Sequence, residues 1–522
     1  MSPLLCMCKI ASYCAQAALY SLKQRRFTLA LLLWMCNVCL YLARTCMSVA
    51  VLEMYGDDEI EGNLLSAFYW GYAVSQPFLG VIAQRWNAKW LLFAAVFVWS
   101  VASAGVALVG NSSEAVPAIF ALRVLVGLAE AANYPSQMQL LSVWAPYEER
   151  SRFWSFVATG EAIGTILALG AGPVLVNKLG WRSIFYVTSA IGGAWAIIFG
   201  VLTASHPERH PRISAAELMH IQATRPPRPP PVSVPYVRIL TNRPFLALVA
   251  THCAYNWGYY VGLSWVSKFF DSKYGVDYAQ LGALSIAPYL VLFATTSISG
   301  VVADGLENRC GASATRARKL VNSLGMGGGA LGFAFLAIVC GPPGLQPSSR
   351  AYVAAACLSI ATGMGGFAAS AGYWATFVDL SPRHSQILLA LSNSVASVPG
   401  IIGVSLTGSI LSSSGDDWRI IFIIAGAVEF GGALLFLAAA EARDQHYDDA
   451  APRGCLWRAS GSRRPAVANA DSRRAKLLSN AHDGAYLADD LADAAPEADE
   501  EEPEPPQYSA AAASSAPASS ST

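Results

Sequence analysis

Two arginines and a glutamate stand inside stretches of sequence that are otherwise apolar. Arg123 and Glu130 belong to one apolar stretch, and Arg44 belongs to an earlier one. At about 100° per residue, Arg123, Glu130 and Gln137 fall on the same face of a helix. A charge at the centre of a bilayer costs roughly 2.5–3.5 kcal/mol on insertion scales. We therefore expect all three charged side chains to face protein or water rather than lipid.

These residue types favour the binding of an anion. A planar guanidinium binds carboxylate or phosphate oxygens through paired hydrogen bonds. If Arg44 and Arg123 converge, they form a positive site, and Glu130 is a carboxylate that can respond to protons or to a cation. Two alternatives stay open. Arg123 and Glu130 could form an internal pair that only helps helices to pack. Glu130 could instead pair with Arg44 and leave no free charge for a ligand.

Other polar side chains in the apolar stretches extend this candidate site. Glu161 and His252 are further candidates for coupling an ion to transport, although a protonated, silent carboxyl and a hydrogen-bonded packing histidine explain them as well. Glu429 is another intramembrane carboxylate with the same two interpretations. The candidate substrate-binding residues beside the two arginines are Tyr41, Tyr72, Tyr134, Tyr255, Asn256 and Asn393.

Composition places these residues in a membrane protein. Of 522 residues, 54% are apolar and 13% are charged, whereas soluble domains carry about 25% charged residues. A spanning helix needs about 20 apolar residues. Helices are required because lipid offers no hydrogen-bond partner to backbone groups, which must therefore pair within the segment. We predict an all-α protein with twelve transmembrane helices at 27–53, 63–84, 89–110, 116–143, 152–177, 182–203, 245–270, 279–303, 319–341, 351–377, 385–412 and 418–440.

The spans divide into two halves with an internal echo. The sequence from Gly80 to Gln84 follows the second span, and the similar sequence from Gly300 to Asp304 follows the eighth. Such repetition is typical of transporters built from two pseudo-symmetric six-helix bundles. The predicted parts are a cytoplasmic N-terminal segment 1–26, bundles 27–203 and 245–441, a proline-rich cytoplasmic linker 204–244, and a disordered cytoplasmic tail 442–522.

Basic residues in alternate connections predict the orientation. One set of connections holds Arg85, Arg150, Arg209 and Arg316, whereas the opposite set is poor in basic residues. By the positive-inside rule, both termini are cytoplasmic. Asn111 begins an Asn-Ser-Ser glycosylation acceptor on the other side. We expect a multi-pass integral membrane protein. The sequence does not choose among the plasma membrane, an endomembrane and the plastid envelope.

Motifs of soluble enzymes are missing from the sequence. It contains no Walker loop, no GxSxG and no HExxH, and no Cys or His cluster with zinc spacing. A polytopic membrane enzyme is disfavoured for the same reason. We expect no enzymatic activity, no metal, no cofactor and no nucleic-acid partner. The eleven cysteines are mostly expected as free thiols packed as small apolar groups.

With these residues, the chain resembles the major facilitator superfamily and, within it, the anion:cation symporter family (solute carrier family 17). The resemblance covers about residues 27–441 and implies Arg44 and Arg123 as anion ligands and Glu130 as the coupling carboxylate. It rests on Tyr41-x-x-Arg44, Phe68-Tyr69-Trp70-Gly71-Tyr72, Arg123 through Glu130, Tyr255-Asn256-Trp257 and Leu391-Ser392-Asn393.

Departures within the family bear on the substrate. The vesicular glutamate carriers have an arginine where this chain has Tyr255, and a histidine where it has Leu65, which weakens a glutamate interpretation. The Tyr255-Asn256-Trp257 form resembles sialin, and Asn256-Trp257-Gly258 is similar to the plant phosphate and anion carriers.

The hypothesis is a monomeric carrier that exposes a central site to each side of the bilayer in turn. Its partners are a small anionic solute, sodium ions or protons, and the lipid bilayer. Inorganic phosphate is favoured slightly over a small organic anion as the substrate, and Glu130 is the favoured coupling group. The alternative is a non-transporting membrane receptor or sensor on the same scaffold.

Overall fold

The computed structural model describes residues 24–146, 149–224, 234–340 and 347–447. Most of the predicted N-terminal segment, the proline-rich centre of the linker and the predicted tail beyond residue 447 lie outside these residues. Within the described ranges, every regular element is a helix. The prediction of an all-α chain is therefore confirmed for the part of the protein that carries the candidate site.

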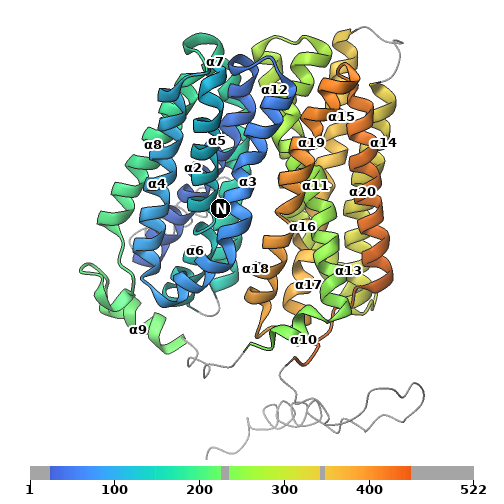
Figure 1. The fold of residues 1–522 in the computed structure, drawn as a ribbon. Coiled ribbons are helices and arrows are strands. Elements are labelled where there is room, and N and C mark those ends of the chain that lie inside the picture. The colour runs from blue at the N-terminus through green and yellow to red at the C-terminus, as the bar shows by residue number, and fades with distance from the viewer. Residues whose placement is uncertain (1–23, 147–148, 225–233, 341–346, 448–522) are drawn as a thin grey trace, which may run out of the picture. The chain divides into compact units, whose positions relative to one another are not determined.

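The first half of the chain forms six long helical segments, drawn from blue to green in Figure 1. One of the six is divided into two helices. The segments are α2 (Arg25–Met54), α3 (Asp58–Arg85), α4 (Ala88–Val109), α5 (Val116–Glu130) with α6 (Asn133–Trp144), α7 (Arg150–Leu179) and α8 (Arg182–Leu202).

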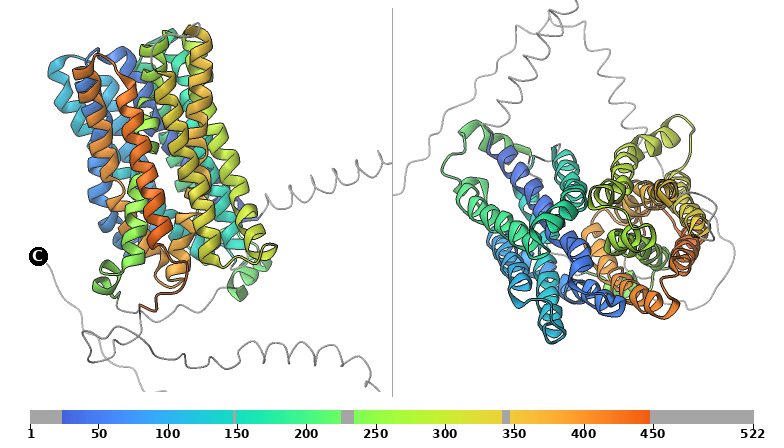
Figure 2. Two further views of the ribbon diagram at one scale, coloured as in Figure 1. Left: turned by 90° about the vertical axis from the view of Figure 1, so that its right-hand side faces the viewer. Right: turned by 90° about the horizontal axis from the view of Figure 1, so that it is seen from above.

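The second half repeats this arrangement from green to orange, and the view from above in Figure 2 separates the two groups of helices. Short helices α9 (Ala215–Thr224) and α10 (Tyr236–Leu240) connect the halves. The second half contains α11 (Arg243–Tyr274), α12 (Tyr278–Asn308), α13 (Ala314–Asn322) with a π-helical turn (Ser323–Gly327) and α14 (Gly328–Val339), α15 (Pro347–Gly363) with α16 (Gly365–Ser370) and α17 (Tyr373–Leu380), α18 (Ser385–Val395) with α19 (Val398–Ser414), and α20 (Trp418–Ala439).

Ten helical segments in the described residues are long and apolar enough to cross a membrane. The helices α3 and α11, 28 and 32 residues long, are not among the ten. Their sequences carry tyrosine, amide and charged residues in place of a continuous apolar run. Both lie where the halves meet, because α3 packs on α19 and α11 packs on α2. Their polarity therefore belongs to the interior of the molecule.

Three predicted spans are broken rather than continuous. The predicted span 116–143 turns at Ala131 and Ala132, so Glu130 is the last residue of α5. Pro135 has no N–H to bond the carbonyl of Ala131, which favours a break at this point. The same kind of turn separates α16 from α17 and α18 from α19. Each of the three breaks lies within its predicted span rather than at its boundary.

The break also redirects Gln137, which continuous helix geometry places on the Arg123 face. Its amide Nε2 donates to Asn37 Oδ1 and Asn133 Oδ1, each at 2.8 Å. Asn133 Nδ2 donates to the same Asn37 oxygen at 2.9 Å, and Asn37 Nδ2 donates to the Val157 carbonyl at 3.0 Å. These fully buried amides join α2, α6 and α7. Gln137 therefore fixes helix packing rather than extending the stripe of charged residues.

Close glycine contacts press α3 against α5. A Cβ atom on Gly71 would collide with the Val124 carbonyl, and one on Gly127 would collide with the Phe68 carbonyl. Small residues at such crossings let two membrane helices approach closely. The contact brings Phe68 of α3 next to Arg123 of α5. The local sequence thus sets the distance between an aromatic face and a candidate anion ligand.

Candidate functional site

The two charged helices of the first half meet through an ion pair. Arg44 Nε and Nη2 of α2 donate to Glu130 Oε2 of α5 at 3.1 and 3.0 Å. The Glu130 side chain is fully buried and that of Arg44 is nearly so. The carboxylate therefore pairs with the arginine of another helix, not with Arg123 of its own helix. Of the two alternatives open from sequence, the Arg44–Glu130 pair is the one present.

Aromatic rings surround the Arg44 guanidinium. Its central carbon lies 4.8 Å from the ring centre of Tyr41, 4.7 Å from that of Phe68 and 5.0 Å from that of Tyr72. A desolvated cation over an aromatic face gains about 2 kcal/mol or more. Phe68 also lies 5.7 Å from the guanidinium of Arg123. One ring thus holds the two positive groups of α2 and α5 on the same side of α3.

Arg123 is the charge without a counterion. Its side chain is buried, its Nε makes no hydrogen bond, and no ion pair of Arg123 occurs among the described residues. Oε1 of Glu130 also lacks a hydrogen-bond partner. Arg44, Arg123 and Glu130 together carry one net positive charge when Glu130 is ionised. A buried, unpaired cation is unfavourable, so this group of side chains favours a negatively charged ligand.

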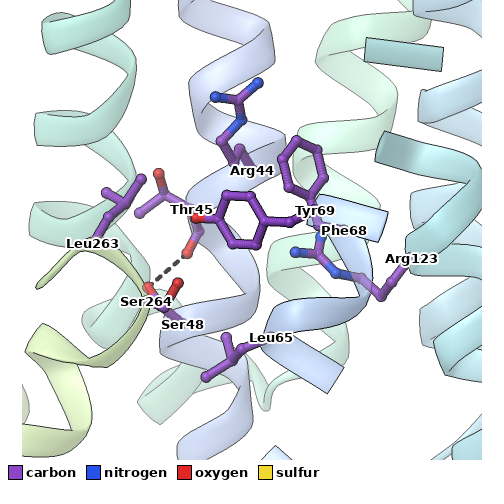
Figure 3. Close-up of a pocket in the computed structure, with 9 residues that line it drawn as sticks. All are labelled: Arg44, Thr45, Ser48, Leu65, Phe68, Tyr69, Arg123, Leu263 and Ser264. Carbon is purple, nitrogen blue, oxygen red and sulfur yellow. Dashed lines mark hydrogen bonds between the residues drawn. The ribbon is translucent and has the colours of Figure 1, made fainter. Parts of the chain in front are cut away.

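A small cavity lies beside the two arginines. Its volume is about 10 Å³, enough for a single water molecule. Figure 3 shows Arg44 and Arg123 approaching it from one side and α11 from the other. The lining residues are Arg44, Thr45, Ser48, Leu65, Phe68, Tyr69, Arg123, Leu263 and Ser264. The arginines therefore stand next to an opening rather than facing lipid.

Glu161 of α7 lies close to the same aromatic group. Its carboxyl group lies near the hydroxyls of Tyr134 and Tyr41. Tyr41 in turn packs on Arg44. The predicted residues Tyr41, Tyr134 and Glu161 therefore belong to one connected cluster with the Arg44–Glu130 pair.

The second half contributes hydroxyls and amides. Asn393 Nδ2 donates to Gln76 Oε1 at 2.9 Å, and the Asn393 side chain lies next to that of Tyr72. Tyr259 lies next to Tyr41 and stacks on Tyr255, with ring centres 5.9 Å apart. Asn393 thus joins the cluster directly, and Tyr255 joins it through Tyr259.

Two predicted residues of α11 have other partners. Asn256 Nδ2 donates to the Ala396 carbonyl at 2.8 Å, across the break between α18 and α19. His252 Nδ1 lies 2.9 Å from Ser392 Oγ, and its ring packs against Tyr373 and Trp374. Neither residue has a contact with Arg44 or Arg123 in the described structure. The arrangement of His252 is the one expected for a packing histidine.

Several lining residues were not predicted from the sequence. Thr45 and Ser48 follow Arg44 on α2. The helical period places Ser48 on the same face as Tyr41 and Arg44, but Ser48 was not assigned to the site. Tyr69 stands in the aromatic motif but was not assigned to the site. Leu263 and Ser264 carry no signal in the sequence, because their place depends on how the second half docks on the first. Within the described ranges, no group of three or more His, Cys, Asp and Glu side chains could hold a metal.

Side-chain bonds join the halves at the end of the molecule opposite to α9 and α10, which we call the far face; the end that carries α9 and α10 is the linker face (Figure 1). Lys268 Nζ of α11 pairs with Asp58 Oδ1 and Glu61 Oε2 of α3, each at 3.1 Å. Ser405 Oγ donates to Asn63 Oδ1 at 2.8 Å. The halves are therefore fastened on the far-face side of the cavity.

Comparison with known proteins identifies the family to which the chain is similar. The model of the Major Facilitator Superfamily matches residues 33–403. Probable anion transporter 6 of Oryza sativa subsp. japonica is 30% identical over 79% of this chain and 97% of its own length. Sialin of Ovis aries is 30% identical over 75% of this chain and 77% of its own length. A protein of Arabidopsis thaliana named sodium-dependent phosphate transport protein 1, chloroplastic, is 28% identical over 79% of this chain and 78% of its own length.

A solved structure supports the fold independently. The inward-facing, unoccupied form of a bacterial homolog of the human lysosomal transporter Spinster superposes with a TM-score of 0.63 at 16% identity. The superposition covers 79% of this chain and 96% of that chain. The predicted fold of twelve helices in two pseudo-symmetric bundles is thereby confirmed. The chain belongs to the major facilitator superfamily and, within it, to the anion:cation symporter family of membrane transporters, and it is not an enzyme.

Proposed function

We propose that this protein carries a small anion across a membrane by exposing the cavity beside Arg44 and Arg123 to each side in turn. The observation that carries the proposal is the buried, unpaired guanidinium of Arg123 next to an opening between the two halves. An anion with two or more oxygens could bind this group and, once Glu130 releases it, Arg44 as well. Inorganic phosphate and a small organic carboxylate share this chemistry.

The ion pair suggests how transport is coupled to a second ion. While Glu130 is ionised, it occupies Arg44 and cancels one of the two positive charges. A proton or a sodium ion at Glu130 would release Arg44 and raise the net positive charge that an anion meets. Binding of the cation and binding of the anion then favour each other by the same free energy, which is the condition for symport. Glu161, which lies near Tyr41 and Tyr134, is a second candidate for the cation.

The relatives narrow the substrate only to a class. One carries phosphate in its name with sodium dependence, and others are named as anion transporters or sialin. The first arm of the test is therefore a panel of phosphate, lactate, gluconate and N-acetylneuraminate in proteoliposomes, with sodium and pH gradients imposed separately. We expect concentrative uptake of at least one anion under one of the two gradients. Binding without uptake under either gradient would refute the carrier and favour the sensor.

The bonds at the far face support alternating access. The pairs of Lys268 with Asp58 and Glu61, and the bond from Ser405 to Asn63, must break before the cavity can open on that side. Rocking of one half against the other about a central site is the general motion of such carriers. The structure is therefore compatible with a state closed at the far face.

We further propose that the linker face is cytoplasmic, with bundles 27–203 and 245–441 as the two moving bodies. Arg85, Arg209 and Arg212 are exposed at this face, as the positive-inside rule requires. A membrane-impermeant maleimide should then label a cysteine at Glu114, in the connection between α4 and α5, from outside intact cells. A cysteine at Arg209 should be labelled only after permeabilisation. The reverse labelling pattern would show that the linker face is on the outside.

A further inference from the structure

The side chain of Tyr69 occupies an unusual place in the cavity. It extends from α3 beside Arg44 and Arg123 and forms part of the cavity wall (Figure 3). Only 3% of Tyr69 is exposed. Its neighbour Phe68 lies against both arginines, whereas Tyr69 turns toward the second half. One residue of the first half therefore reaches across the site to the other half.

Two helices of the second half hold this ring. The ring centre of Tyr260 of α11 lies 4.5 Å away, and the hydroxyl of Tyr69 lies near Ser264, one turn further along α11. Gly400 of α19 faces the ring directly, because a Cβ atom there would lie 2.5 Å from Tyr69 Cγ and Cδ1. The side chain thus fits closely between α11 and α19.

The volume of the cavity shows what this fit excludes. A space of about 10 Å³ holds one water molecule, so neither phosphate nor an organic anion can enter while Tyr69 lies in place. Arg44 is held by Glu130, and Phe68 is held between two guanidinium groups. Among the large side chains of the lining, Tyr69 is the one whose contacts are made mainly with the opposite half. Separation of the halves releases it, and the space it leaves is the space available to an anion.

We propose that Tyr69 is a specificity-determining residue that acts as a plug: its withdrawal opens the anion site, and its bulk limits the size of the anion that fits beside Arg44 and Arg123. The inference rests on the proposed function and deepens it. Removal of the ring should admit larger anions, whereas removal of the hydroxyl alone should loosen the closed state without changing the size limit. Selectivity in a pocket follows its shape, and a volume change of several carbons is enough for about tenfold discrimination.

The test compares Tyr69→Ala and Tyr69→Phe in full-length protein in proteoliposomes. For Tyr69→Ala, the ratio of kcat/KM for N-acetylneuraminate to kcat/KM for phosphate should rise about tenfold or more. For Tyr69→Phe, this ratio should stay within about twofold while the turnover number changes, because only the hydroxyl near Ser264 is lost and the ring remains. Tyr289→Phe and Tyr289→Ala are the matched controls, since Tyr289 is a buried tyrosine of α12 outside the cavity lining. Both controls should leave the ratio unchanged.

A second variant tests the plug from the other side. Gly400→Ala adds a methyl group against the ring and should push it toward the arginines, lowering kcat/KM for the larger anions more than for phosphate. If Tyr69→Ala changes kcat/KM for all anions by the same factor, the plug is refuted while the carrier stands. If wild-type protein takes up none of the four anions under either gradient, the proposed function fails and the plug fails with it.

Discussion

Two buried glutamates, one in each half, show what distinguishes a candidate site from a packed interior. Glu130 of α5 and Glu429 of α20 are equally inaccessible. Glu130 meets Arg44 at 3.0 Å and lies near a cavity. Glu429 has no hydrogen bond and no ion pair in the described structure, and it lies against Gly258 and Gly329. We therefore expect a role in coupling for Glu130 and none for Glu429.

The same contrast extends to the halves as a whole. The first half supplies both arginines, Glu130 and Glu161 to the cluster, whereas the second supplies Tyr259, Asn393 and Ser264. In the carrier that we propose, the first half holds the anion through its charged side chains. The second half is then a cover that can move away without leaving a charge exposed to lipid.

The arginines should give the largest effect. Arg123→Ala or Arg44→Ala should lower anion uptake by about 100-fold or more, since truncating a buried charge partner loses roughly 3 kcal/mol of binding. Arg419→Ala is the control in the second half, because Arg419 is half exposed and pairs with Asp417 outside the site. Uptake per reconstituted protein is the measurement. If an arginine variant retains uptake within threefold of wild type, the anion site lies elsewhere.

The two glutamates test the contrast itself. Glu130→Gln should uncouple transport, so that anion exchange continues while gradient-driven accumulation falls about tenfold or more, because the amide cannot take up a proton or pair with Arg44 as an ion. Glu429→Gln should keep accumulation within about twofold, since no partner responds to its charge. Normal accumulation after Glu130→Gln would show that Glu130 is not the coupling residue. Loss of accumulation after Glu429→Gln would show that the second half takes part in coupling.

Much of the fold could be predicted because lipid imposes a simple rule on sequence. Apolar stretches of spanning length must become helices, so the positions of α2, α4 and α20 follow from composition. The breaks were harder to predict. Periodicity treats residues 116–143 as one helix, although Pro135 removes the hydrogen bond that would join its two parts. The prediction that Arg123, Glu130 and Gln137 share a face is wrong beyond that point, since Gln137 turns to Asn37.

The site could be predicted only where charge made it visible. Arg44, Arg123 and Glu130 are costly in lipid, so their presence alone demanded an explanation. The partner of Glu130 could not be deduced from the sequence. Arg123, seven residues earlier on the same helix, and Arg44, on a neighbouring helix, were both possible partners. Ser264 and Leu263 were invisible for a different reason. Their sequence neighbourhood is ordinary, and only the docking of two halves places them in the cavity.

The last prediction concerns protein stability rather than transport, and it concerns the far face. There the first half carries the negative side chains and the second half carries a positive one. Here the first half presents Asp58 and Glu61, and the second half presents Lys268. Glu61 precedes the apolar run of α3 and is fully buried. Burial raises the pKa of Glu61 from 4.5 to about 7, although Lys268 lowers it and Asp58 and Asp57 raise it slightly. The folded protein therefore binds this proton more tightly than the unfolded chain.

The sign of the pH dependence follows from that difference. Between pH 4.5 and about 7, the folded state holds more protons at Glu61, so the free energy of unfolding falls as the pH rises through this window, by roughly 1–3 kcal/mol. Lys268→Met removes the cation that lowers the pKa of Glu61, so the window should extend above pH 7. Glu61→Gln should abolish this fall in the free energy of unfolding. The pH dependence is measured by thermal unfolding of detergent-solubilised protein between pH 4.5 and 9. An unchanged pH profile in both variants would mean that this junction of the halves does not respond to protons.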